Sequence, residues 1–158
     1  MAKILLGFMG AGKSTIARAL SADFLDMDEL IVQKIGMSIQ EYFAEYGEPA
    51  FRKIEAEVLA ECIQQDIVLS TGGGVVLSPQ NRDLLAQNPQ NIYLKADFET
   101  LFRRIEGDPE NQRPLYLTKG KADLQEIFEQ RQALYEAVAT QTIDVVGKTP
   151  QEIIEEIQ

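Results

Sequence analysis

The chain contains no histidine, and this absence excludes several kinds of active site. Imidazole is the side chain that most readily changes charge near neutral pH, and it is a common zinc ligand. Catalytic triads built on histidine and histidine-rich metal sites are therefore excluded. The chemistry of this protein must rest on other side chains.

Cysteine and basic residues are also scarce. The one cysteine, Cys62, cannot form an intramolecular disulfide, and we interpret it as a small core residue. The 15 lysines and arginines face 25 acidic residues, a formal charge of −10, which argues against general nucleic-acid binding. The apolar N-terminal run is soon broken by Gly7 and Gly10 and is too short for a signal peptide or a membrane span. We therefore expect a soluble cytoplasmic protein.

The order of apolar and helical patterns predicts the fold class. The 158 residues, 45% of them hydrophobic, suit one domain with a sizeable core. We predict strands at 3–8, 23–25, 67–70, 91–94 and 142–146, and helices at 14–22, 29–34, 38–64 (broken near 47–49), 79–87, 98–105, 121–139 and 150–157. This alternation predicts βαβ crossovers, and therefore an α/β fold whose parallel sheet carries helices on both faces.

The first predicted strand leads into the most specific motif of the chain. Residues 7–15, GFMGAGKST, match the phosphate-binding pattern G-x-x-x-x-G-K-[ST] in full and are followed by a helical pattern. In such a P-loop, backbone N–H groups point at an anion and the helix N-terminus adds positive potential. Lys13 would contact the β- and γ-phosphates, and Ser14 would ligate Mg²⁺. A chance glycine-rich turn is the alternative, and the strand–loop–helix context argues against it.

Two carboxylates, Asp26 and Asp28, follow the second predicted strand. Residues two apart in an extended segment point the same way, so both side chains could face one site. One could orient or deprotonate a substrate hydroxyl while the other helps to hold Mg²⁺. The structural alternative is a helix N-cap with an acidic first turn, and the two interpretations are compatible.

Three consecutive glycines at 72–74 follow the third predicted strand, where many P-loop proteins carry an aspartate that holds Mg²⁺. We interpret this triple glycine as bare backbone whose N–H groups can approach a phosphate or a substrate oxygen. The alternative is a tight turn, which needs only one or two glycines. Because no acid stands here, Mg²⁺ is expected to have few direct protein ligands.

Two arginines lie on predicted helices. Arg52 and Glu55 are three residues apart, a spacing that by itself is best explained by a surface ion pair of little consequence. Arg131 falls on the apolar stripe of the helix at 123–139, seven residues after Leu124. An inward guanidinium is costly unless it meets an anion, and that anion could be an internal carboxylate or a ligand carboxylate.

The segment 107–120 is polar, rich in glycine and proline, and long for a loop in a compact domain. Loops of this kind are often lids that close over substrates. We therefore expect a mobile lid here.

Together these motifs resemble the shikimate kinases. The P-loop, D-M-D at 26–28, F-R-K-I-E at 51–55, T-G-G-G at 71–74, R-P-L at 113–115 and Arg131 occur in the order typical of that family, across nearly the whole chain. The resemblance implies a single domain of the nucleoside-monophosphate-kinase type, with three αβα layers, five parallel strands, substrate-binding helices at about 29–64 and the lid. It implies ATP-dependent phosphorylation of the 3-hydroxyl of shikimate for aromatic amino-acid biosynthesis. We expect a monomer that binds shikimate, ATP and Mg²⁺, without nucleic acid or membrane.

The resemblance also implies roles for particular residues. Catalysis is expected from Lys13, Asp28 and Arg113. Expected ATP contacts come from the P-loop, the lid and the adenine side: Gly10, Ala11, Gly12, Lys13, Ser14, Thr15, Arg104, Arg113 and Lys148. Expected contacts with the second substrate come from Asp28, Arg52, Gly73, Gly74 and Arg131. Mg²⁺ is expected to bind Ser14 directly and Asp26 through water.

The chain departs from the family pattern in three places. The stretch from Lys13 to Asp26 is about one helical turn shorter than is usual, so we expect a shortened first helix. Arg104 lies farther from Arg113 than the usual spacing, which bears on the adenine contact. Val32 stands where the family commonly has an acid.

Two alternative functions remain open from the sequence. Another P-loop kinase of small metabolites, such as a gluconate kinase, is disfavoured by the triple glycine together with Arg52 and Arg131. A non-catalytic relative that binds ligand or a partner is disfavoured by the intact P-loop, Asp28 and Arg113.

Overall fold

The computed structural model describes residues 1–107 and 120–157 of the chain. Its centre is one five-stranded sheet, wholly parallel, with the order β2-β3-β1-β4-β5. The strands are β1 (Lys3–Leu6), β2 (Leu25–Asp26), β3 (Val68–Ser70), β4 (Asn91–Lys95) and β5 (Gln141–Asp144). In the register of the central strand, Leu5 lies between Ser70 of β3 and Ile92 of β4.

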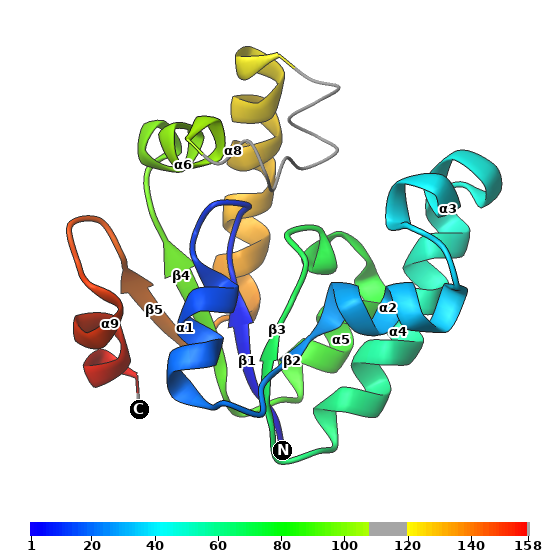
Figure 1. Cartoon of the computed structure of the whole chain (residues 1–158), viewed down its shortest axis with the longest axis horizontal. Helices are drawn as coiled ribbons and strands as arrows, with labels where there is room; N and C mark the ends of the chain where they lie inside the picture. Colours follow the sequence, from blue (N-terminus) through cyan, green and yellow to red (C-terminus); the bar gives the residue numbers. More distant parts are fainter. Residues whose placement is uncertain (108–119, 158) are drawn as a thin grey trace.

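Helices cover both faces of this sheet, which confirms the predicted three-layer α/β fold (Figure 1). Helices α1 and α9 pack together on one face, and α4, α5 and α8 lie on the other. The helices are α1 (Lys13–Leu20), α2 (Met27–Ile35), α3 (Ile39–Tyr46), α4 (Glu48–Ile63), α5 (Pro79–Ala86), α6 (Phe98–Glu106), α8 (Lys121–Val138) and α9 (Pro150–Glu156), with a 3₁₀ turn η1 (Val75–Leu77) after β3.

The sequence explains why these elements form where they do. Ile4, Leu5 and Leu6 are fully buried, because the middle strand of a doubly covered parallel sheet is apolar on both sides. The predicted break in the long helical pattern is confirmed: Gly47 has φ +86°, and Pro49 lies in the first turn of α4. The shortened first helix is also confirmed, since α1 has only 8 residues.

Several strand boundaries were misplaced by one or two residues. The second strand is Leu25–Asp26 rather than 23–25, the last is Gln141–Asp144 rather than 142–146, and the first ends at Leu6 rather than at residue 8. The first of these errors affects the site. Because β2 runs directly into α2, Asp28 lies in the first helical turn and not in an extended segment.

The predicted lid at 107–120 lies almost entirely outside the described residues, and Arg113 lies outside them as well. Within residues 1–107 and 120–157, no helix has the length and apolar character needed to cross a bilayer.

Candidate active site

The carboxyl ends of β1, β2 and β3 open into a cavity of about 580 Å³. In open parallel sheets, ligands bind at this edge. The P-loop, the start of α2, the α3–α4 region, the triple glycine and α8 all line the cavity. It gathers most of the predicted site residues, namely Gly10, Gly12, Lys13, Ser14, Thr15, Asp26, Asp28, Arg52, Gly73, Gly74 and Arg131.

The P-loop has the geometry that its sequence predicts. Gly10 and Gly12 adopt φ +85° and +92°, a region that side-chain-bearing residues rarely occupy. The loop curls over the ammonium group of Lys13, which donates to the carbonyl oxygens of Gly7 at 2.6 Å and Phe8 at 3.2 Å. Ala11 is a buried residue of the loop and does not line the cavity. A cation is therefore fixed at the loop that begins α1.

Asp26 links the end of β2 to two neighbouring elements. Its Oδ1 caps α2 by accepting the backbone N–H groups of Asp28 at 3.0 Å and Glu29 at 3.4 Å. Its Oδ2 accepts the Ser14 hydroxyl at 3.3 Å. The predicted helix cap is thus confirmed, and the second carboxylate oxygen faces the P-loop serine.

Asp28 reaches the same cavity from the first turn of α2. Solvent still reaches its carboxyl group, but protein flanks it closely. This desolvation raises its pKa and the Asp26 carboxylate adds to the rise, while Lys13 and Arg52 oppose it. A raised pKa makes a carboxylate a stronger proton acceptor.

The triple glycine brings three different side chains close to one strip of backbone. A Cβ atom at Gly72 would lie 2.8 Å from Asp28 Oδ1, and one at Gly74 would lie 2.8 Å from Arg52 Nη2. At Gly73 it would lie 3.5 Å from Arg131 Nη1. None of the three glycines has a positive φ. The absence of side chains is therefore explained by close packing of functional groups, a reason that the sequence prediction did not include.

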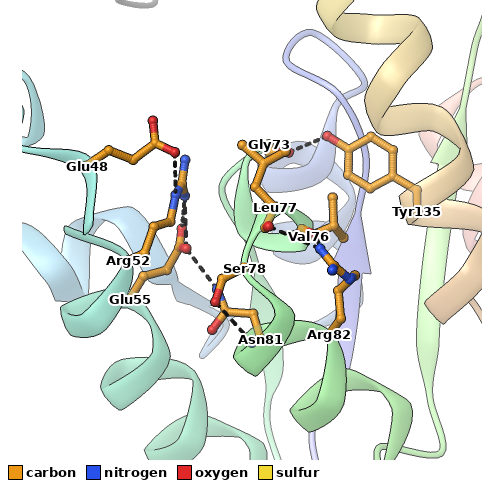
Figure 2. Close-up of polar contacts among 10 residues, drawn as sticks. All are labelled: Glu48, Arg52, Glu55, Gly73, Val76, Leu77, Ser78, Asn81, Arg82 and Tyr135. Carbon is orange, nitrogen blue, oxygen red and sulfur yellow. Dashed lines mark hydrogen bonds and ion pairs between the residues drawn. The ribbon is translucent and has the colours of Figure 1, made fainter. Parts of the chain in front are cut away.

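The sequence interpretation of Arg52 and Glu55 as a surface ion pair was wrong. Glu55 is only 2% exposed, and its two carboxylate oxygens accept Arg52 Nη1 at 2.9 and 3.0 Å. Asn81 of α5 donates to the same carboxylate at 2.8 Å (Figure 2). The rings of Phe43 and Phe51 lie near the guanidinium. Spacing predicted the pair, but only the fold shows that α5 covers it.

The buried surroundings of Glu55 change the pKa of its carboxyl group. Desolvation raises its pKa above the ordinary value, and the charge and hydrogen bond of Arg52, with the hydrogen bond from Asn81, act against the rise. The carboxylate thus depends on these partners to remain ionised inside the protein.

Arg131 is the second arginine of the cavity, and it is buried, with 8% of its surface exposed. Its guanidinium lies over the ring of Phe8, and its Nε has no hydrogen-bond partner among the described residues. Burial lowers its pKa, which the nearby Tyr135 side chain partly offsets. The salt bridges among the described residues do not include Arg131, so the inward arginine predicted from the sequence has no internal carboxylate there.

The predicted adenine contacts lie elsewhere. Arg104 of α6 donates to the carbonyl oxygen of Gly10 at 3.2 Å, which connects α6 to the P-loop. Lys148, in the β5–α9 loop, pairs with Glu156 at 2.8 Å. Neither residue lines the cavity. Val32 is 39% exposed on α2 and is not a lining residue either.

Oxygen ligands for a small hard cation converge beside the P-loop. The Ser14 hydroxyl lies 3.3 Å from Asp26 Oδ2 and 3.4 Å from the Ser70 hydroxyl. This set of hydroxyls and one carboxylate fits Mg²⁺, which prefers oxygen and keeps several waters. No group of three acidic, histidine or cysteine side chains suited to a metal occurs in the described part of the chain.

Sequence reasoning missed three residues that complete the site. Ser70 and Glu55 line the cavity, and Tyr135 contacts its glycine strip. Tyr135 lies four residues after Arg131, on the same apolar stripe, where its ring resembles any core residue. The only feature of the sequence that could have indicated its role was the hydroxyl group, because a buried phenol usually forms a hydrogen bond.

Comparisons with known proteins agree with this geometry. The family model of shikimate kinase matches residues 9–158. A shikimate kinase of Streptococcus gordonii is 57% identical over 100% of this chain and 99% of its own length, and one of Streptococcus thermophilus is 47% identical over 97% and 96%. A solved shikimate kinase of Acinetobacter baumannii in complex with shikimate has a TM-score of 0.84 at 31% identity, over 98% of this chain and 89% of that one. One from Bacteroides thetaiotaomicron has a TM-score of 0.86 at 26% identity, over 98% and 94%.

Proposed function

The chain belongs to the shikimate kinase family, and from that premise we propose how its residues transfer a phosphoryl group from ATP to shikimate. The observation that carries the proposal is a cavity with a P-loop at one end and two arginines at the other, the buried Arg131 and the half-buried Arg52. The first end suits a nucleoside triphosphate, and the second suits a small carboxylate. The acceptor is the 3-hydroxyl of shikimate.

The P-loop end binds ATP. Its backbone N–H groups and the N-terminus of α1 surround the phosphates, with contacts from Gly10 through Thr15. A bound phosphate offers the Lys13 ammonium charged oxygens in place of the two neutral carbonyls that it meets in the structure. Arg104 and Lys148 contact the adenine side of the nucleotide.

Mg²⁺ would be held by Ser14 directly and by Asp26 through water, close to Ser70. When bound, the cation would neutralise part of the charge that builds up during transfer. Because Asp26 Oδ1 caps α2, its Oδ2, which accepts the Ser14 hydroxyl in the structure, is the oxygen that would orient such a water.

The opposite end binds shikimate. Arg52 and Arg131 hold its carboxylate, while Gly73 and Gly74 offer backbone beside the ring. Charge complementarity supports this assignment, because Arg131 has no internal carboxylate among the described residues and unpaired buried charge is costly. A planar guanidinium offers a carboxylate two parallel hydrogen bonds.

Asp28 lies between the two ends and orients the acceptor hydroxyl, taking its proton as the phosphoryl group arrives. The raised pKa of Asp28 suits this role. Arg113, which lies outside the described residues, supplies positive charge to the transferring group. The rest of the catalysis is positioning, because phosphoryl transfer needs little covalent help from a protein. We propose that the enzyme works as a monomer in the cytoplasm.

A coupled ADP-release assay with three acceptor conditions tests this function. Shikimate should support steady turnover with Mg²⁺ and ATP, whereas gluconate and no added acceptor should give only background. Turnover with gluconate would favour a different metabolite kinase. Background rates with every acceptor, from protein that binds shikimate normally, would favour a non-catalytic binding protein.

A further inference from the structure

The hydroxyl group of Tyr135 is a buried polar group that the proposed mechanism leaves unused. Tyr135 is fully buried in α8, and its ring packs against that of Tyr93 in β4, with centroids 5.1 Å apart. Stacking on the sheet fixes where the phenol can point. Figure 2 shows the hydroxyl directed at the triple glycine, where it donates to the carbonyl oxygen of Gly73.

Arg131 and Tyr135 meet at the same point of the cavity wall. They lie four residues apart on α8 and therefore share one face of the helix. A Cβ atom built on Gly73 would lie 3.5 Å from Arg131 Nη1 and 3.6 Å from the Tyr135 hydroxyl oxygen. The guanidinium and the phenol thus flank one glycine, and their side chains interact.

We propose that Tyr135 is a positioning residue for shikimate, acting through Arg131 and the Gly73 backbone; this inference rests on the proposed role of Arg131. The hydroxyl donates its proton to the Gly73 carbonyl, so its lone pairs face outward for the neighbouring guanidinium. It therefore fixes the distance between the arginine and the glycine strip. Tyr135 itself touches neither the phosphates nor the reacting oxygen.

The physical reason is that Arg131 has too few other hydrogen-bond partners to hold its side chain in one rotamer. Its Nε lacks a hydrogen-bond partner in the described part of the structure, and a long side chain held at one point can take several rotamers. Arg52 differs, because Glu55, which itself accepts a hydrogen bond from Asn81, already holds it on the other wall. Tyr135 is the corresponding anchor for Arg131, with a neutral oxygen in place of a carboxylate. A neutral anchor leaves the charge of Arg131 available for an anionic ligand.

Tyr135→Phe tests this directly, because it removes one oxygen and keeps the ring. The KM for shikimate should rise about tenfold, the usual effect of losing one such hydrogen bond, while the KM for ATP stays within twofold. Tyr93→Phe is the matched control: it removes a hydroxyl from the other ring of the same buried pair and should leave both KM values unchanged. Equal effects of the two variants, or equal changes in both KM values for Tyr135→Phe, would overturn the proposal.

The same substitution in an Arg131→Ala background separates this inference from the proposed function. If Tyr135 acts through Arg131, its removal should have little further effect once the guanidinium is absent. A normal shikimate KM in Arg131→Ala alone would contradict the proposed function. A raised KM in Arg131→Ala with a normal KM in Tyr135→Phe would contradict only the role of Tyr135.

A measurement on the unaltered enzyme covers the case in which Tyr135→Phe does not fold. The buried Tyr135 hydroxyl proton should give a slowly exchanging NMR signal, assigned through isotope-labelled tyrosine rings. Shikimate should shift this signal and ATP should not. A signal indifferent to shikimate would contradict the proposal.

Discussion

Lys13 is the single residue on which phosphoryl transfer should depend most. Its ammonium lies within the curl of the P-loop, 2.6 Å from the Gly7 carbonyl oxygen. Lys13→Ala should lower kcat by about 100- to 1000-fold, because one preorganised donor to transition-state charge contributes roughly that much. Lys53→Ala removes a lysine from the exposed side of α4 and serves as the control for charge. Near-normal turnover of Lys13→Ala in the coupled assay would rule out this mechanism.

The negative charge of the Asp28 carboxylate should lower the stability of the folded protein at neutral pH. Its pKa is raised on folding, so the folded state binds the proton more tightly than the unfolded state does. Stability is therefore lost as the pH rises above the unfolded pKa, which is about 3.9. A functional carboxylate beside Asp26 costs stability for this reason.

Asp28→Asn keeps the shape of the neutral acid and removes this charge. The Tm of ligand-free Asp28→Asn should exceed that of the parent at pH 8, and the difference should shrink as the pH falls towards 4. Thermal melts across this range check it, with Asp66→Asn in the exposed bend before β3 as the control. A lower Tm for Asp28→Asn at pH 8 would show that Lys13 and Arg52 outweigh the burial. Turnover should be nearly lost in either case.

At the scale of elements, substitutions in the loop between β3 and η1 should have effects that depend on their position. The backbone conformation at Gly72 and at Gly74 is one that alanine can adopt, since neither residue has a positive φ. Each new methyl group would collide with a different side chain, Asp28 in one case and Arg52 in the other, at 2.8 Å. The two variants therefore perturb different steps.

Gly72→Ala should mainly lower kcat, whereas Gly74→Ala should raise the KM for shikimate by about tenfold through displacement of Arg52. The KM for ATP and the Tm should change little in both, because the displaced atoms are side-chain ends. Steady-state kinetics with each substrate varied in turn would separate the two effects. Identical kinetic changes in both variants would mean that the loop tolerates no side chain for a backbone reason.

The elements also show why the sequence predicted some features and not others. The P-loop is a local motif whose spacing determines its shape, so its glycines and Lys13 were predicted correctly. The extended geometry expected at Asp28 was wrong, because α2 begins at Met27, directly after β2, whereas the alternative of a capped helix with an acidic first turn was correct. Local patterns locate elements better than they locate the ends of elements.

At the scale of the whole molecule, the missing information was which distant segments meet. Glu55 looks like an exposed helix residue until α5 is packed against α4, and then Asn81 covers it. Tyr135 looks like core until the triple glycine lies beside α8. No spacing within one helix reveals such contacts. They depend on the order of the strands in the sheet, because β3 and β1 lie side by side and bring the loops that follow them to one edge.

The whole fold therefore places two guanidinium groups, one buried and one half-buried, in one cavity of an acidic protein with a net charge of −10. The field of the molecule does not favour an anion, so recognition of a carboxylate must be local. Two charge-assisted hydrogen-bonding partners, each contributing roughly 1.5–3 kcal/mol, are sufficient for such recognition. Lysine cannot reproduce the paired geometry of either arginine.

Calorimetric titration with shikimate and with its carboxamide analogue tests this central claim most directly. The parent should bind the acid one to two orders of magnitude more tightly than the amide, at about 1.4 kcal/mol for each factor of ten. Arg131→Lys and Arg52→Lys should each lose most of that preference while binding ATP normally. If the parent binds the carboxamide as tightly as shikimate, neither arginine recognises a carboxylate, and the account of this cavity is wrong.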